Sequence, residues 1–387
     1  MKILFAAFGS AGDLLPLVPV ASELASRGHE VRWAVPRSLG LYLRFLGWTS
    51  VAIGDGAEMR VFADQQVVSR DFDGWRSWRR TMTQYVTPSM TDGLRDLERH
   101  HIGWQADVVV GSGFAVAARL FAHRNEIALV ECSIYPQFAS LRHNTRLARS
   151  CRDAVSRVAR TANSETIHRI QWGSPPDILL HDSELVASSA FISGFPYWDD
   201  LPPWRAGVAP VLEWLEGRPG KKVLCTFGSF LGAAQVDVVN DLVHCAAELD
   251  LHVVIAGISR ERIGPLGSDV EARIFVAQHV RTSLVASSVD AVVHHGGVGT
   301  TFACLHAARP AVVFPLAFDQ PHNARIVERV GVGVDATNRK LRTCIQEVVY
   351  SDGFSRRSQE LQGRLVQPRV AALSAALRVE QLGASPA

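Results

Sequence analysis

The sequence predicts an α/β protein made of two similar, doubly wound domains. Apolar strands alternate with amphipathic helices between Lys2 and Val130, and a second series of the same kind opens at Lys222. A stretch rich in Pro, Gly and Trp separates the two series. Because 387 residues are too many for one ordinary core, we expect two domains, each a parallel sheet covered by helices.

The first series begins with the apolar segment 2–8 (KILFAAF), predicted to be a strand that runs into a Gly-Ser turn. A helix is expected over 14–27, because Leu17, Val20 and Leu24 recur on one face. Strands at 29–35, 107–110 and 127–130 and a helix over 113–124 continue the alternation.

The second series echoes the first, since KVLCTFGSFLG from Lys222 repeats the pattern of KILFAAFGSAG, with Phe-Gly-Ser at 8–10 and again at 227–229. This internal similarity predicts a second doubly wound domain. We therefore expect four parts, which are an N-terminal domain over 1–195, a linker over 196–219, a C-terminal domain over 220–365 and a C-terminal helix at 366–387 that packs back on the first domain.

Composition excludes several classes of function. The net charge of +2 is too small and too dispersed to indicate nucleic acid or an anionic membrane as partner. The apolar run at the N-terminus is too short for a bilayer and lacks a cleavage site, so we expect no stable membrane insertion. Six cysteines without a CxxC pair are typical of buried free thiols, which predicts a cytoplasmic protein.

Residues 289–320, VDAVVHHGGVGTTFACLHAARPAVVFPLAFDQ, contain the most specific signal. An apolar strand runs into Gly296-Gly297-Val298-Gly299 and then into a helix, which places unpaired backbone N–H groups at the positive end of a helix dipole. No Gly-Lys-Ser/Thr follows and the spacing is not GxGxxG, which excludes a P-loop and a dinucleotide fingerprint. The pattern predicts a site for another diphosphate ligand.

This stretch resembles the donor-binding signature of the inverting nucleotide-sugar glycosyltransferases of the two-domain GT-B type. The loop GSAGDLLP at 9–16 is similar to the GSxGDxxP pattern of the antibiotic and sterol branch. The resemblance implies two Rossmann-like domains facing an interdomain cleft, and a UDP- or dTDP-sugar as co-substrate without a further cofactor. The resembled family works without a metal-binding DxD motif, so the resemblance implies that no metal is needed.

The resemblance also implies roles for individual residues around the donor. His294 would contact the diphosphate and His295 would be packed or solvent-facing, while backbone or hydroxyl donors would come from the glycine turn and from both Gly-Ser turns. The expected donor-binding residues are Ser10, Gly12, Ser229, Val280, His294, Gly296, Gly297, Val298, Gly299, Thr300, Asp319 and Gln320.

Simpler interpretations of several of these residues remain open. Ser10 and Ser229 are also suited to capping the helix that follows each turn, and Asp319 or Gln320 to capping the helix near Pro321. The Asp-Gln pair would otherwise hold vicinal sugar hydroxyls. Two departures from the family pattern stand out in the printed sequence, namely Ala11 where many relatives have Arg and Arg281 where a proline usually follows the base-contacting Val280.

Asp13 is the candidate catalytic residue. It fits a helix N-cap ahead of Pro16, and it also fits a general base that removes the proton of an acceptor hydroxyl, the interpretation we favour. In the resembled branch the Asp of this loop is the general base, and one residue can serve both purposes.

The acceptor is expected to be a hydrophobic small molecule such as a natural product. Apolar and aromatic residues of the N-terminal half would bind it, namely Phe62, Trp75, Trp78, Met90 and Phe114. The segment 62–101 fits either an insertion lining a cleft or an ordinary helix with a solvated basic face. We expect a monomer or homodimer, and two other functions remain open, an inactive auxiliary partner that binds nucleotide-sugar and a sugar-nucleotide epimerase.

Overall fold

The computed structural model describes residues 1–54, 80–101, 103–112, 115–136, 156, 176–228, 233–316 and 318–384. By their contacts these residues separate into two compact units. Unit 1 contains the described residues up to Trp198 together with those from Val366 onward, and unit 2 contains Asp199–Leu365. Each unit is described below by itself.

Unit 1 is built on a seven-stranded parallel sheet with the order β3-β2-β1-β4-β5-β6-β7. The strands are β1 (Lys2–Ala6), β2 (Glu30–Val35), β3 (Ser50–Ala52), β4 (Val108–Ser112), β5 (Ala128–Ser133), β6 (Ile178–Leu179) and β7 (Phe191–Ile192). The helices are α1 (Ala11–Leu14), α2 (Leu17–Ser26), α3 (Arg37–Phe45), η1 (Thr81–Val86), α6 (Thr87–His101), α7 (Val116–Arg124) and α19 (Pro368–Gly383).

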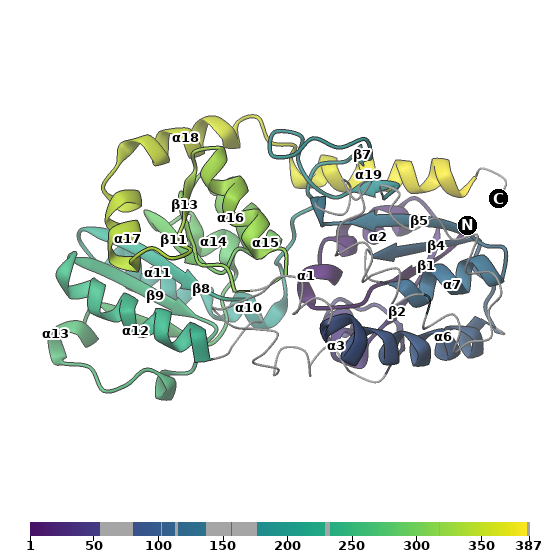
Figure 1. The fold of residues 1–387 in the computed structure, drawn as a ribbon, viewed down its shortest axis with the longest axis horizontal. Coiled ribbons are helices and arrows are strands. Elements are labelled where there is room, and N and C mark those ends of the chain that lie inside the picture. Colours follow the sequence, from purple (N-terminus) through teal and green to yellow (C-terminus); the bar gives the residue numbers. More distant parts are fainter. Residues whose placement is uncertain are drawn as a thin grey trace. The chain divides into compact units, whose positions relative to one another are not determined.

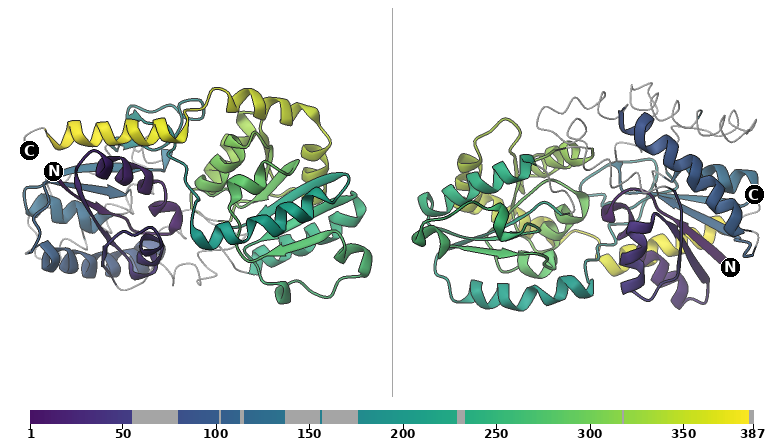
Figure 2. Two further views of the ribbon diagram at one scale, coloured as in Figure 1. Left: turned by 180° about the vertical axis from the view of Figure 1, so that it is seen from behind. Right: turned by 90° about the horizontal axis from the view of Figure 1, so that it is seen from below.

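Helices cover both faces of this sheet, with α2 and α19 side by side on one face and α6 and α7 on the other (Figures 1 and 2). The central strand β1 is therefore buried on both sides, and Ile3 and Phe5 have no exposed surface. This explains why its sequence is an unbroken apolar run rather than an alternating one.

The C-terminal helix α19 is part of unit 1, where it packs on α2 and β5. Its buried face is formed mainly by alanines, which let the helix lie close to its neighbours, and Glu380 adds a polar anchor. The Glu380 carboxylate accepts hydrogen bonds from Arg27 (2.8 and 2.9 Å) and from His29 (2.7 Å). These bonds, that from Arg27 first, lower the pKa of Glu380 to about 2.

Unit 2 is built on a six-stranded parallel sheet with the order β10-β9-β8-β11-β12-β13. The strands are β8 (Lys221–Thr226), β9 (Leu251–Ala256), β10 (Ile274–Ala277), β11 (Ala291–His294), β12 (Ala311–Val313) and β13 (Gly333–Asp335). The helices are α10 (Pro202–Ala206), α11 (Val208–Glu216), α12 (Ala233–Glu248), η3 (Arg260–Arg262), α13 (Ser268–Glu271), α14 (Thr282–Ala286), α15 (Val298–His306), α16 (Gln320–Arg329), α17 (Leu341–Val349) and α18 (Asp352–Gln362).

Side chains of successive residues on each strand enter different cores of unit 2. Val223 and Cys225 of β8 pack into the core beneath α12 and α17, whereas Leu224 packs into the core beneath α11 and α14. Burial on both faces is what a parallel sheet inside two helical layers requires. Two parallel-sheet α/β domains were expected from the sequence, and the observed architecture confirms this fold class.

The sequence predicts a linker over 196–219, but most of this segment is helical and belongs to unit 2. Val211 and Leu215 of α11 are buried against the sheet. Pro202 stands in the first turn of α10, where its missing N–H costs no intrahelical bond, so it starts a helix here rather than ending one.

Among the residues the structure describes, five cysteines are present, and all five are buried free thiols. None of the described helices combines the length and the apolar character that a bilayer crossing demands.

Candidate active site

Asp13 lies just beyond the carboxyl end of β1, in the third position of the short helix α1. In an open parallel sheet ligands gather at this edge, near the point where strand order reverses, and here β1 pairs with both β2 and β4. The side chain is only 5% exposed. A buried carboxylate at this position needs partners, because burying an isolated charge is costly.

Among the residues that the structure describes, three hydrogen bonds reach the Asp13 carboxylate. Ser10 donates twice to Oδ2, from its backbone N–H (2.7 Å) and from its hydroxyl (3.1 Å). The hydroxyl of Tyr135, which follows β5, donates to Oδ1. The structure thus corrects the cap interpretation, because Ser10 is the N-cap of α1 and Asp13 closes a capping box with one oxygen while the other bonds to Tyr135.

Burial raises the pKa of Asp13 from 3.8 to about 6, against the hydrogen bonds from Tyr135 and Ser10, which lower it. A carboxyl group with a pKa near neutral can accept a proton during catalysis and release it again at physiological pH. Perturbed carboxyl groups of this kind are typical of functional sites.

Gly9 allows the carboxylate to sit where it does. Its φ is +125°, and a Cβ at this position would lie 2.3 Å from Oδ2 of Asp13. Any other residue would be strained and would displace the Asp13 side chain. Tyr135, by contrast, is 122 positions from Asp13 in the chain, and no local pattern in the sequence marks it as a partner.

The glycine turn of unit 2 joins β11 to α15, next to the place where β8 and β11 pair. α15 begins after Gly297 without a side-chain cap, and the first intrahelical bond runs from Thr301 N–H to Gly297 O. The N–H groups of Val298, Gly299 and Thr300 therefore lack intrahelical acceptors, as at every helix start. Such a helix start, with its dipole, is suited to holding an anion.

His294 ends β11 and is completely buried. Its Nδ1 accepts the Gly296 N–H at 3.0 Å, so the neutral ring carries its proton on Nε2. That Nε2 is buried and has no hydrogen-bond partner within the described ranges of the chain. Burial, with His295 nearby, lowers the pKa of His294 to about 3, which keeps the ring neutral.

His295 was expected to be packed or solvent-facing, and it is packed, with its ring against the glycine turn. A Cβ on Gly297 would lie 2.5 Å from its Nε2, and a Cβ on Gly228 would lie 3.1 Å from its Cε1. The ring therefore lies between the turn after β8 and the start of α15. Burial lowers its pKa to about 4, so it too is neutral at pH 7. Alternation along the strand separates the two histidines, but it does not tell which of them faces Gly297 and Gly228.

Asp319 and Gln320 lie at the start of α16, which contacts the glycine turn. Asp319 is the N-cap position but makes no side-chain cap bond, and its Oδ2 accepts from Asn323 Nδ2 at 2.8 Å instead. Asn323 Nδ2 also donates to Gly296 O at 2.7 Å, and this residue was not singled out in the sequence. The carboxamide oxygen of Gln320, which is 1% exposed, accepts the Leu316 N–H at 2.8 Å. Asp319 thus supports the glycine turn through Asn323, whereas the Gln320 side chain fixes the segment before α16.

Val280 lies between β10 and α14, and its side chain is 7% exposed in the core beneath α11 and α14. Its main chain is the expected contact to the base. Two neighbours fix this loop, because Gly207 packs on the carbonyl of His279 and Asp199 binds Arg281.

The remaining expected site residues have different outcomes. Met90 is 1% exposed and packs with Leu94 and Leu97 in the core of unit 1, so the described part of 62–101 matches the ordinary packed helix rather than a ligand surface. The others lie outside the described residues, namely Phe62, Trp75, Trp78, Phe114 and Ser229. Among the described residues no group of three or more His, Cys, Asp or Glu is placed to hold a metal ion.

Comparisons with known proteins agree with this architecture. Residues 240–376 match the family described as Erythromycin biosynthesis protein CIII-like, C-terminal domain. The vancomycin aglycone glucosyltransferase of Amycolatopsis orientalis is 24% identical over 363 residues, which cover 86% of this chain and 85% of that protein. The aclacinomycin-T 2-deoxy-L-fucose transferase of Streptomyces galilaeus is 22% identical over 382 residues, with 86% and 84% covered.

A solved structure extends the likeness to the fold as a whole. The glycosyltransferase SsfS6 of Streptomyces sp. SF2575, complexed with thymidine diphosphate, superposes with a TM-score of 0.73 at 19% identity, covering 98% of this chain and 99% of that one. The chain therefore has the GT-B glycosyltransferase fold and is related, over most of its length, to antibiotic-type glycosyltransferases.

Proposed function

We propose that this protein is an inverting, metal-independent glycosyltransferase that moves a sugar from a dTDP- or UDP-sugar to a hydroxyl group of a hydrophobic small molecule. The observation that carries the proposal is the buried Asp13 carboxyl group, whose pKa is raised to about 6 at the carboxyl end of β1. A group of this kind is suited to general-base chemistry near neutral pH. The likeness to glycosyltransferases supports the reaction class.

Asp13 would act through Oδ1. Its oxygens offer about four lone-pair positions, and three described donors occupy one on Oδ1 and two on Oδ2. The remaining position on Oδ1 would take the proton of the acceptor hydroxyl. As that proton leaves, the acceptor oxygen forms a bond to the anomeric carbon, the bond from this carbon to the phosphate oxygen breaks, and the nucleoside diphosphate departs with the electron pair.

The start of α15 would hold the diphosphate. Its uncapped N–H groups and the buried Nε2 of His294 are donors that suit phosphate oxygens and the charge that develops on the leaving group. The position of the His295 ring beside Gly297 and Gly228 makes it a second candidate donor or orienting group. Because both rings are neutral, the positive potential would come from the helix and its N–H groups.

Ser229 would add a phosphate contact, Asp319 and Gln320 would meet the sugar, and Val280 would meet the base. Ser10 and Gly12 were also expected to bind the donor, but both donors of Ser10 go to Asp13 and the Gly12 N–H goes to the Ser10 hydroxyl oxygen. These two residues would therefore hold the Asp13 loop. The thymidine diphosphate bound to SsfS6 favours dTDP over UDP as the first nucleotide to test. Tyr135 would position Asp13 rather than contact the substrate.

The test is calorimetric titration of the full chain with dTDP and with UDP in EDTA, followed by a turnover assay that detects released dTDP. Micromolar binding of one nucleotide in EDTA is expected, and the anomeric configuration of the product, read by NMR, reports inversion. Absence of binding by both nucleotides would refute the proposal.

Three variants separate binding from chemistry. Asp13→Asn keeps the shape of the side chain and should bind dTDP normally but lose turnover; retained turnover would exclude the base role. His294→Ala and His295→Ala should each weaken dTDP binding, and the larger loss identifies the histidine that serves the diphosphate. An auxiliary protein would bind nucleotide and turn over nothing even with Asp13 intact.

A further inference from the structure

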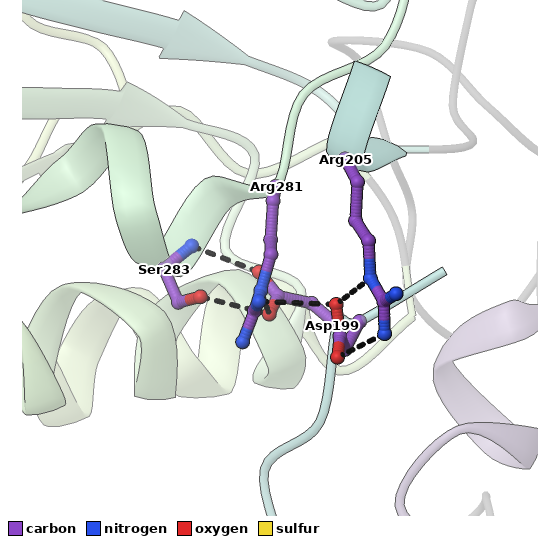
Figure 3. Close-up of polar contacts among 5 residues, drawn as sticks. Asp199, Arg205, Arg281 and Ser283 are labelled. Atoms are coloured by element: carbon purple, nitrogen blue, oxygen red, sulfur yellow. Dashed lines mark hydrogen bonds and ion pairs between the residues drawn. The ribbon is translucent and has the colours of Figure 1, made fainter. Parts of the chain in front are cut away.

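Arg281, the residue after Val280, is held by Asp199 and Asp200, which lie just before α10 (Figure 3). Its Nε donates to Asp199 Oδ1 at 3.1 Å and its Nη1 to Asp200 Oδ1 at 3.0 Å. Arg205 binds Asp200 from the other side, with Nη2 to Oδ2 at 2.6 Å. Asp199 is only 6% exposed, so its carboxylate is little screened by water where it accepts the bond from Arg281.

Asp199 also caps α14. The cap residue Arg281 makes no side-chain cap bond of its own, and Asp199 Oδ2 accepts the Ser283 N–H at 2.8 Å while Oδ1 accepts the Ser283 hydroxyl at 2.8 Å. A carboxylate at the first turn of a helix satisfies an otherwise unpaired N–H and complements the helix dipole. Asp199 is thus hydrogen-bonded both to the N-cap residue Arg281 and to the first turn of α14.

Gly207 restrains the same loop through a close backbone contact. A Cβ at this position would lie 1.9 Å from the carbonyl oxygen of His279, so the junction of α10 and α11 lies directly against the loop main chain. With β10 ending at Ala277, the residues 278–281 are fixed at the strand, at Gly207 and at Asp199.

The backbone of Arg281 has φ −76°, within the range to which a proline ring confines φ. The usual proline of this position would stiffen the loop through its ring. Here the loop carries a flexible residue whose side chain is instead held by two carboxylates.

We propose that Asp199 is a positioning residue which, through Arg281 and Ser283, holds the main chain of Val280 in place for the pyrimidine base of the donor nucleotide. This inference rests on the proposed function. It adds that the nucleoside part of the donor, and not its diphosphate, depends on the segment before α10.

The experiment compares Asp199→Asn with wild type in titrations with dTDP and with inorganic pyrophosphate, which lacks the base. Loss of the charge-assisted hydrogen bonds of this buried carboxylate should weaken dTDP binding roughly ten-fold or more and leave pyrophosphate binding unchanged. Asp269→Asn, the same chemical change at an exposed position of α13 in unit 2, is the matched control and should bind like wild type.

A second background tests the link to Arg281. In Arg281→Pro the ring fixes φ, so Asp199→Asn should cost several-fold less dTDP affinity there than in the wild-type background. Equal loss in both backgrounds, equal loss of dTDP and pyrophosphate, or no loss of either would each overturn the inference.

Amide hydrogen exchange of the protein without nucleotide tests this inference independently of the proposed function. Asp199→Asn should speed exchange of the Ser283 amide about ten-fold while the amides of β11 stay protected. If the wild type binds no nucleotide, both the proposed function and the positioning of the base fail. Hydrogen exchange still reports whether Asp199 stabilises the first turn of α14. If the wild type binds dTDP and neither the Ser283 amide nor dTDP affinity responds, only the inference fails.

Discussion

Replacing Tyr135 by Phe removes one hydroxyl from the candidate active site and leaves the ring in place. That hydroxyl donates to Oδ1 of Asp13 and stabilises the ionised carboxylate. Its loss should therefore raise the pKa of Asp13 above its value of about 6. A general base works only when deprotonated, so the acid limb of the pH–rate profile should move to higher pH.

The size of the effect follows from the bond that is lost. A hydrogen bond to a charged group is worth about 1.5–3 kcal/mol, and 1.36 kcal/mol corresponds to one pH unit, so the limb should move upward by about 1 to 2 pH units. At a pH well above the acid limbs of both proteins, the turnover of Tyr135→Phe should approach that of the wild type. At pH 6 it should be roughly five- to fifty-fold lower, because that shift leaves about 9% to 1% of the carboxyl groups deprotonated instead of about half.

The assay is kcat/KM for donor consumption between pH 5 and pH 9. Tyr350→Phe is the matched control, because it removes a hydroxyl that donates to Leu249 O in unit 2. A limb that stays in place, or a loss of rate that is equal at every pH, would refute the assignment of Tyr135 as the partner that sets the basicity of Asp13.

Three further substitutions test other contacts. Asp13→Asn should raise the free energy of unfolding at pH 8 by on the order of 3 kcal/mol. Because its pKa is raised, the carboxyl group stabilises the fold fully below pH 3.8 and loses that contribution as the pH rises through about 6. Urea unfolding at pH 4 and pH 8 measures the difference, and a gain confined to pH 4 would contradict the prediction. Gly9→Ala should abolish turnover but not dTDP binding, because its Cβ would displace the Asp13 carboxylate. Gly297→Ala should weaken dTDP binding roughly ten-fold, because its Cβ would displace the His295 ring. Gly264→Ala is the control, since a Cβ at that position meets no atom within 4 Å. Equal dTDP affinities of these two variants would argue against a role for the His295 ring.

The architecture was predictable because its strongest signals are local. An apolar run such as 2–8 is long enough for a strand and too short for a typical helix, and the helical pattern after it makes a crossover to a parallel neighbour the simplest connection. The glycine turn was predictable for the same reason, since strand, glycines and helix follow one another directly in 291–306. The interpretation of 196–219 as a linker relied on prolines as chain breakers, and a proline in the first turn of a helix produces the same signal.

The partners of the site could not be predicted, because each lies far away in sequence and is brought near by the sheet. Tyr135 follows β5 and reaches Asp13 after β1, since the carboxyl ends of parallel strands share one edge. Asp199 and Arg281 are 82 positions apart and have no periodic relation to each other. A motif can therefore indicate which residue reacts, whereas its basicity and the stiffness of a binding loop depend on hydrogen bonds that exist only after folding. This is why Asp13 could be chosen from the loop 9–16 alone, while a pKa near 6 required the burial and the three donors that the folded unit supplies.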